Sequence, residues 1–403
     1  MGGSMVSSKE RLADTLLVHG IANELGQQAA KSPLWVRKPD KQRYVIPVYD
    51  LQALAIWPSN TDEQEIALHQ SAADKLKQLA ARALYYTGFD EGELTIRKER
   101  SGRYVIEAIR LHTYSSPHSE RLITDAKLTR QAAEAQPDSP RAPLLLGMDP
   151  EFILLTAAGK VVSANRFLAQ HGQVGYDRVT VRGRSDAHPL VELRPEPSSE
   201  PIGLVRNLRR SMWAASGLIT DPSLRWIAGG MPIPGLPLGG HIHISGIRMC
   251  SSIVRALDNY LALPLVMLEH PSAAERRKRY GKLGDVREKA YGGFEYRTLP
   301  SMLLSPRITK GALALTKLIV METDRFRGRF LDRLEVLKAY YAGDKAQLVP
   351  AVAAAWADIR SADGYAQYAN YLEPLGEWIM ARRSWNEQLD FRRAWRIPPY
   401  HES

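Results

Sequence analysis

The first third of the chain alternates between helical and strand patterns of apolar residues. Apolar positions from Leu12 to Ile21 recur at helical spacing and predict a helix over about residues 9–30, capped by Ser7 or Ser8. The other elements expected here are hairpins pairing 34–38 with 43–49 and 94–98 with 104–111, a helix from Asn60 or Thr61 to near Gly88, and a helix over about 119–135. This pattern predicts a small α+β domain over 1–140, with no recognisable catalytic constellation.

Residues 136–143 contain three prolines in eight positions, which suppress both helix and central strand and mark a domain boundary. A second domain with charged strands is expected over 141–305. Helical patterns cover 201–219 and 252–269 within it, and a helical C-terminal part is expected over 306–403, packed on the second domain and broken near Gly343 and Gly364.

The stretch 239–245, Gly-Gly-His-Ile-His-Ile-Ser, carries the most distinctive pattern. Side chains alternate across a strand, so His241, His243 and Ser245 share one face while two isoleucines pack on the other. The two glycines before His241 allow another backbone or a ligand to approach closely. Alone, such a pattern is more often a half-exposed sheet face than a metal site.

Three other stretches alternate in the same way, each with ionisable residues on one face: 148–152, 191–196 and 294–297. Thr156 to Lys160 is expected to turn a hairpin after the first of them. A solvated sheet face explains such alternation, but these faces carry mainly carboxylate, imidazole and guanidinium groups. If they converge, they need a counter-charge, which a divalent metal and a polyanionic substrate would provide.

Composition narrows the possible partners. The 403 residues carry a formal charge of +10, which favours anionic partners, and the single cysteine, Cys250, excludes an internal disulfide. No apolar run is long enough to span a membrane, so we expect a soluble cytoplasmic protein without a membrane partner. Residues 378–398 are rich in Trp and Arg, but burial of Trp385 and Trp395 with solvated arginines is favoured over nucleic-acid binding.

Four motifs in this order resemble a family: Gly147 to Phe152, Glu192 to Pro195, Gly240 to Ser245, and Arg279-Tyr-Gly followed by Phe294 to Pro300. They look like the predicted amidoligases of the glutamine synthetase and glutamate-cysteine ligase superfamily, of the type called COOH-NH2 ligase type 2. The resemblance covers about 144–305. It implies an α+β fold with a curved antiparallel sheet of the glutamine-synthetase type, helices on its outer face, and a ligase catalytic domain at 141–305.

The resemblance also implies roles for individual residues. The metal ligands, for Mg²⁺ or alternatively Mn²⁺, would be Asp149, Glu151, Glu192, His241 and Glu295, with Glu196 a weaker candidate. The catalytic residues would be Arg297, Arg287 and His243, and the residues that bind ATP or a substrate carboxylate would be Arg279, Arg194, Lys282 and Ser245. Successive same-side positions on a strand lie about 6.6 Å apart, so we expect only His241 to bind the metal, and His243 the substrate or phosphate.

These expectations describe an ATP-dependent ligase that joins the carboxylate of an amino acid or peptide to an amine through an acyl phosphate. Hard metals and arginines suit the phosphoryl transfer that activates a carboxylate. No P-loop motif occurs, and a nucleic-acid binder would not need four carboxylates on shared faces. Phosphoryl transfer to a nitrogen acceptor, as in guanidino kinases, and a non-catalytic metal- or anion-binding module stay open. Lys282, Arg287 and Lys289 read equally well as a solvated charged run.

Overall fold

The computed structural model describes residues 2–26, 42–59, 68–134, 142–179 and 187–400. The chain divides into two compact units, one made of Met1–Pro140 with Asp332–Lys338 and the other of Arg141–Leu331 with Ala339–Ser403. The predicted strand 34–38, the proposed helix start at Asn60 or Thr61, and most of the proline-rich boundary lie outside the described residues.

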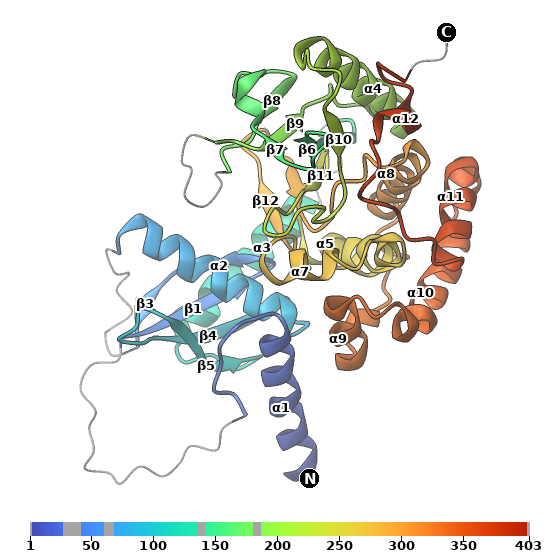
Figure 1. Cartoon of the computed structure of the whole chain (residues 1–403). Helices are drawn as coiled ribbons and strands as arrows, with labels where there is room; N and C mark the ends of the chain where they lie inside the picture. The colour runs from blue at the N-terminus through green and yellow to red at the C-terminus, as the bar shows by residue number, and fades with distance from the viewer. Residues whose placement is uncertain (1, 27–41, 60–67, 135–141, 180–186, 401–403) are drawn as a thin grey trace. The chain divides into compact units, whose positions relative to one another are not determined.

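The first unit is a small antiparallel sheet with helices (Figure 1). Its sheet has the order β2-β1-β4-β5, with β3 also paired to β1. The strands are β1 (Arg43–Tyr49), β2 (Gln52–Ala53), β3 (Trp57–Pro58), β4 (Glu91–Lys98) and β5 (Tyr104–Arg110), and the helices are α1 (Gly2–Val18), α2 (Gln70–Tyr86) and α3 (Pro117–Glu134). The predicted hairpin of 94–98 with 104–111 is confirmed as the β4–β5 pair, and Gly102 in its turn has a φ of +82°.

Both ends of the first helix differ from the prediction, and its start is at Gly2 and not after a cap at Ser7 or Ser8. The helix expected over 9–30 ends at Val18, because Gly20 adopts a φ of +75° and the Gly20 and Ile21 amides donate to the carbonyls of Leu17 and Leu16. These two bonds form a Schellman motif, which closes a helix. Apolar spacing alone did not reveal either end of α1. The helix expected to end near Gly88 is α2, which covers Gln70–Tyr86 in the described residues.

The second unit contains an eight-stranded antiparallel sheet with the order β12-β13-β11-β6-β9-β8, in which β7 and β10 also pair with β6. Its strands are β6 (Leu145–Leu155), β7 (Val161–Val162), β8 (Val174–Tyr176), β9 (Leu190–Leu193), β10 (Arg225–Ile227), β11 (Gly240–Ser245), β12 (Val286–Glu288) and β13 (Phe294–Tyr296). The predicted α+β class with antiparallel sheets is confirmed, and the turn at Thr156 to Lys160 joins β6 to β7.

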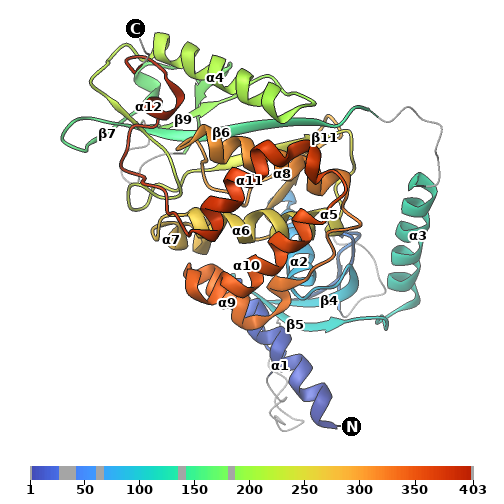
Figure 2. The same ribbon diagram turned by 90° about the vertical axis from the view of Figure 1, so that its right-hand side faces the viewer.

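Helices account for much of the rest of this unit, and the helical stretch around Asp332–Lys338 belongs partly to the first unit (Figure 2). The bounds are η1 (Ala164–Arg166), α4 (Pro201–Leu218), α5 (Ser251–Leu257), η2 (Asp258–Ala262), α6 (Leu263–Leu265), η3 (Val266–Leu268), α7 (Ala273–Arg279), α8 (Pro306–Met321), η4 (Phe330–Asp332), α9 (Leu334–Ala342), α10 (Lys345–Arg360), α11 (Tyr365–Met380) and α12 (Arg392–Trp395). Helix α4 packs on β6, β8 and β9, and α8 packs against α4, α5 and α11. The helix predicted over 252–269 is the nearly continuous run from α5 to η3.

The C-terminal segment confirms one expectation and contradicts another. Trp385 and Trp395 are buried as predicted, and the Trp395 indole donates to the carbonyl of Leu303 at 2.6 Å. Arg392, expected to stay solvated, is only 3% exposed. Its guanidinium binds Asp390 and the Leu224 carbonyl, so its charge is compensated inside the unit. Within the described residues, no helix is long and apolar enough to cross a membrane.

Candidate active site

The strand register of the second unit brings the predicted charged residues together. Residues directly opposite one another in an antiparallel pair point to the same face of the sheet. The register pairs His241 with Asp149, Glu151 with Glu192, and Glu295 with both His243 and Arg287. Because β11 lies between β6 and β13, one face of the sheet collects imidazoles and carboxylates from four strands.

This face forms the floor of a cavity of about 970 Å³. The predicted residues that line it are Asp149, Glu151, Glu192, Arg194, His241, His243, Ser245, Arg287, Glu295 and Arg297. Asp177, Tyr280, Lys289 and Tyr291 also line it, although the sequence reasoning gave none of them a role in the site.

Three predicted candidates do not join this group. Arg279 is exposed at the end of α7, and Lys282 and Glu196 are also absent from the cavity lining. Glu196 lies beyond the sheet because β9 ends at Leu193, and not at Glu196 as expected. Pro195 has no amide hydrogen with which to continue the ladder.

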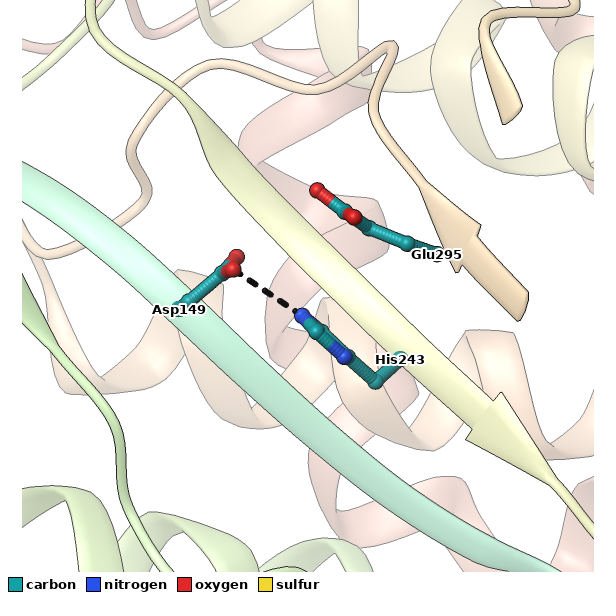
Figure 3. Close-up of side chains that lie close together, drawn as sticks. All are labelled: Asp149, His243 and Glu295. Atoms are coloured by element: carbon teal, nitrogen blue, oxygen red, sulfur yellow. Dashed lines mark ion pairs between the residues drawn. The ribbon is translucent and has the colours of Figure 1, made fainter. Parts of the chain in front are cut away.

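Asp149 occupies the centre of the site and contacts both histidines through different oxygens. Its Oδ1 lies 3.1 Å from His241 Nδ1, and its Oδ2 lies 3.0 Å from His243 Nε2. His241 Nδ1 also lies 3.1 Å from Glu295 Oε1. Figure 3 shows Asp149, His243 and Glu295 converging, and one ligand atom from each lies within 4.8 Å of the others. Both histidines thus reach the same carboxylate, and the assignment of the metal to His241 alone stays a prediction.

Glu295 is surrounded by positive charge. Lys289 Nζ lies 2.5 Å from its carboxylate, Arg297 lies 3.5 Å away and Arg287 3.7 Å away. Burial opposes ionisation of Glu295, but contacts with His241 and Lys289 outweigh it and lower its pKa to about 2. Burial likewise opposes the charged form of His241, yet the Asp149 and Glu295 carboxylates raise its pKa to about 10.

The pKa values of Glu151 and Glu192 are shifted in the direction opposite to that of Glu295. Burial raises the pKa of each to about 7, and the neighbouring Asp149 and Asp177 carboxylates contribute in the same direction. Glu151 accepts a hydrogen bond from the Gly239 amide at 2.6 Å, and Glu192 forms an ion pair with Arg194. These carboxylates lack enough positive charge to stay fully ionised near neutral pH.

The two glycines before His241 allow the close approach that the sequence predicted. A Cβ on Gly240 would lie 2.2 Å from the carbonyl oxygen of Pro300, and one on Gly239 would lie 2.2 Å from His241 Nε2. Either methyl group would displace the backbone or the imidazole. Glycine is therefore required here to keep the His241 ring in the cavity.

The donor set fits a hard divalent metal. Four buried atoms of the site make no hydrogen bond of acceptable geometry within the described part of the chain, although opposite charges lie close to them: Asp149 Oδ1, His241 Nδ1, His243 Nε2 and Glu295 Oε2. Buried polar atoms normally find partners, so their convergence indicates a missing one. Carboxylate oxygens with a minority of imidazole nitrogens suit Mg²⁺ or Mn²⁺ better than a thiophilic metal.

Two tyrosines hold the outer nitrogens of the histidines. Tyr280 Oη lies 3.0 Å from His241 Nε2, and Tyr291 Oη lies 3.1 Å from His243 Nδ1. Tyr280 directly follows Arg279 in a motif that the sequence already singled out, so its neighbourhood was visible. Tyr291 and Lys289 lie around the β12–β13 turn, which gave no periodic signal.

The position of the segment after α7 depends on Arg276, to which the sequence analysis gave no role. This guanidinium is 2% exposed and donates to the carbonyls of Thr298 and Leu299 at 2.8 and 2.7 Å. It therefore ties the end of α7 to the segment that follows Arg297. Arg276 supports the site without lining the cavity.

Comparisons with known proteins match this site to a family. Residues 146–397, more than half of the chain, match the family described as phage phiEco32-like COOH.NH2 ligase-type 2. This range continues well beyond residue 305, where the motif resemblance ends, and includes the C-terminal helices α8 to α12. No curated protein matches the chain.

Several solved structures are similar at low identity. A bifunctional glutathione synthetase from Pasteurella multocida is 11% identical over 62% of this chain and 52% of its own, with a TM-score of 0.40. Plasmodium falciparum glutamine synthetase is 9% identical over 73% and 74%, with a TM-score of 0.31, and GmaS without ligand is 15% identical over 85% and 96%, with a TM-score of 0.32. The chain spans about half the length of the glutathione synthetase.

Proposed function

Because the chain belongs to the phage phiEco32-like COOH.NH2 ligase-type 2 family, we propose that it is an ATP-dependent ligase that joins a carboxylate to an amine. The observation that carries this proposal is the convergence of Asp149, His241, His243 and Glu295 in one cavity bordered by Arg287, Lys289 and Arg297. Acidic and basic side chains arranged in this way can bind a nucleoside triphosphate together with its divalent cation.

The residues that would hold the metal are Asp149, Glu295 and His241, with Glu192 and Glu151 at the neighbouring position on the sheet. When bound, Mg²⁺ or Mn²⁺ would neutralise phosphate charge and orient the phosphate groups. The cation would also favour the ionised forms of Glu151 and Glu192, whose pKa values are raised by burial.

The cations at the β12–β13 edge would bind the transferring phosphate. Arg297 is partly buried and presents a planar fork of donors, which suits two equatorial phosphate oxygens. Arg287 is more exposed and lies at the same edge. On the opposite side of the floor, Arg194 would bind a substrate carboxylate, and Ser245 at the end of β11 would offer a hydroxyl to a ligand elsewhere in the cavity.

The proposed reaction has two steps. An oxygen of the substrate carboxylate attacks the γ-phosphorus of ATP, the bond from phosphorus to the bridging oxygen breaks, and ADP leaves. The amine then attacks the acyl carbon, a carbon–nitrogen bond forms, and inorganic phosphate leaves with the activated oxygen. The amine also gives up a proton, for which carboxylates such as Asp177 at the cavity wall are available acceptors.

The proposed substrates are an amino acid or peptide that supplies the carboxylate and a separate amine. A cavity of about 970 Å³ has room for the phosphates and a small peptide group together. The chemistry does not require a covalent enzyme intermediate, and Cys250 is buried outside the cavity lining. His243 would contact the substrate or the phosphate in addition to Asp149.

A product screen tests this function. The purified chain is incubated with ATP, Mg²⁺ and panels of amino acids and short peptides, and ADP, phosphate and condensed products are measured by mass spectrometry. We expect ADP, phosphate and an amide in equal amounts. ADP with a phosphorylated amine would instead identify a kinase, and metal binding without turnover in any panel would identify a binding module. The variant Asp149→Asn, with one metal-facing oxygen replaced, serves as the inactive control.

A further inference from the structure

We propose that Tyr280 is a positioning residue that holds His241 in its metal-binding orientation and ties it to Arg297. The inference rests on the proposed function, because it assumes that His241 faces a metal and Arg297 a phosphate. It assigns a role to a side chain that stands in one of the sequence motifs but to which neither the motif nor the family match gives a function.

The Tyr280 hydroxyl bridges the two groups. Its oxygen lies 3.0 Å from His241 Nε2 and 2.9 Å from Arg297 Nη2. His241 Nδ1, on the other side of the same ring, lies 3.1 Å from both Asp149 and Glu295. One phenol oxygen thus connects the acidic centre of the cavity with its cationic edge.

The hydrogen-bonding capacity of Arg297 fixes the direction of one of these two bonds. A guanidinium only donates, so Arg297 donates to the Tyr280 oxygen. That oxygen has a second lone pair, which can accept a hydrogen from His241 Nε2. In the neutral ring that binds a metal, a hydrogen held on Nε2 would leave the Nδ1 lone pair facing the metal position between Asp149 and Glu295. A histidine ligand is normally oriented by such a partner on its other nitrogen.

Tyr280 is itself held firmly. Its ring lies near the guanidiniums of Arg276 and Arg297, whose central carbons are 5.3 and 5.6 Å from the ring centroid. Its amide donates to the Arg276 carbonyl at 2.8 Å, and Arg276 fixes the segment after Arg297 through two backbone carbonyls. The hydroxyl therefore comes from a rigid support, and its position is set by packing.

Tyr291 provides a comparison within the same cavity. Its hydroxyl lies 3.1 Å from His243 Nδ1, but the residue is 60% exposed and stands in the β12–β13 turn. Among the residues that the structure describes, it contacts one histidine and makes no hydrogen bond to an arginine. Tyr280 is thus the tyrosine whose oxygen joins a candidate metal ligand to a candidate phosphate ligand.

The test measures metal binding without ATP or turnover. Mn²⁺ affinity is determined by electron paramagnetic resonance for the wild type, Tyr280→Phe, His241→Ala and the double variant. Tyr280→Phe removes only the oxygen, and we expect it to weaken Mn²⁺ binding by about 10- to 100-fold. In the His241→Ala background the same change should weaken binding by less than about twofold, because no imidazole is left to orient. Tyr365→Phe, which removes a hydroxyl bound to Glu373 on α11, is the matched control and should bind Mn²⁺ like the wild type.

Unchanged Mn²⁺ affinity in Tyr280→Phe, or an equal loss in both backgrounds, would overturn the proposal. Histidine-selective ¹⁵N NMR gives a second readout that does not depend on His241→Ala folding: Tyr280→Phe should shift the Nε2 signal of one histidine, and an unchanged spectrum counts against the role. Because none of these measurements requires an amide product, failure of the ligase screen with an intact Mn²⁺ effect would reject the proposed function and support the positioning role.

Discussion

Glu151 and Glu295 line the same cavity, and we predict that their replacement by glutamine changes stability in opposite directions. Each side chain is 2% exposed, so solvent does little to screen either. Glutamine keeps the shape of the side chain and a carbonyl oxygen, which preserves an acceptor for the Gly239 amide beside Glu151. The comparison therefore isolates the effect of the negative charge.

The magnitude follows from the pKa values. Glu295 ionises with a pKa of about 2 in place of its ordinary 4.5, which at about 1.4 kcal/mol per pKa unit makes its charged form worth about 3 kcal/mol to the folded protein. This stability is present above the unfolded value and is lost as pH falls toward 2. The pKa of Glu151 is raised to about 7, so its ionisation costs about 3 kcal/mol once pH exceeds 7, and little at pH 5.

The assay is urea denaturation of the metal-free protein in EDTA at pH 5 and pH 8.5. Glu295→Gln should lose about 3 kcal/mol at pH 8.5, whereas Glu151→Gln should gain about 3 kcal/mol at pH 8.5 and under about 1 kcal/mol at pH 5. Saturating Mg²⁺ should reduce the gain of Glu151→Gln, because a cation stabilises the carboxylate. A loss of stability in Glu151→Gln at pH 8.5, or no loss in Glu295→Gln, would refute the electrostatic reasoning.

Three further predictions concern catalysis. After exhaustive EDTA treatment, activity should vanish and return with Mg²⁺ or Mn²⁺; recovery with Zn²⁺ alone would contradict the hard-metal site. Arg297→Lys keeps the charge but loses the planar fork, so initial-rate kinetics should show a nearly unchanged KM for ATP and a kcat lowered about 100-fold or more; wild-type turnover would make Arg297 structural. Raised Mg²⁺ should partly rescue the initial rate of His241→Ala but not that of His243→Ala, and equal rescue would show that both histidines bind the metal.

The sequence predicted which side chains share one face of a strand better than it predicted which distant residues contact them. Because side chains alternate with a period of two, the shared face of His241, His243 and Ser245 followed from the sequence alone, and the register then placed Asp149 and Glu295 beside the histidines. The glycines at 239 and 240 also signalled a close approach that the Pro300 carbonyl accounts for. Local chemistry and alternation were enough for these features.

Contacts between distant segments were not predictable in this way. Tyr280 reaches His241 from the end of α7, and Lys289 reaches Glu295 from a turn, so neither shares a periodic pattern with its partner. Arg279 illustrates the opposite error: its motif position was distinctive, yet the end of α7 directs its side chain to solvent and leaves the adjacent tyrosine in the cavity. Chain geometry at the end of a short helix decides which of two neighbouring residues joins a site.

Oxygen tracing tests the central claim most directly. Once the screen has identified a carboxylate substrate, it is labelled with ¹⁸O in both carboxylate oxygens and converted with ATP and Mg²⁺, and the released phosphate is analysed by mass spectrometry. Activation through an acyl phosphate predicts one ¹⁸O atom transferred to inorganic phosphate for each amide formed. Phosphate without ¹⁸O, or label recovered in AMP, would show that this cavity does not activate a carboxylate by transfer of the γ-phosphate.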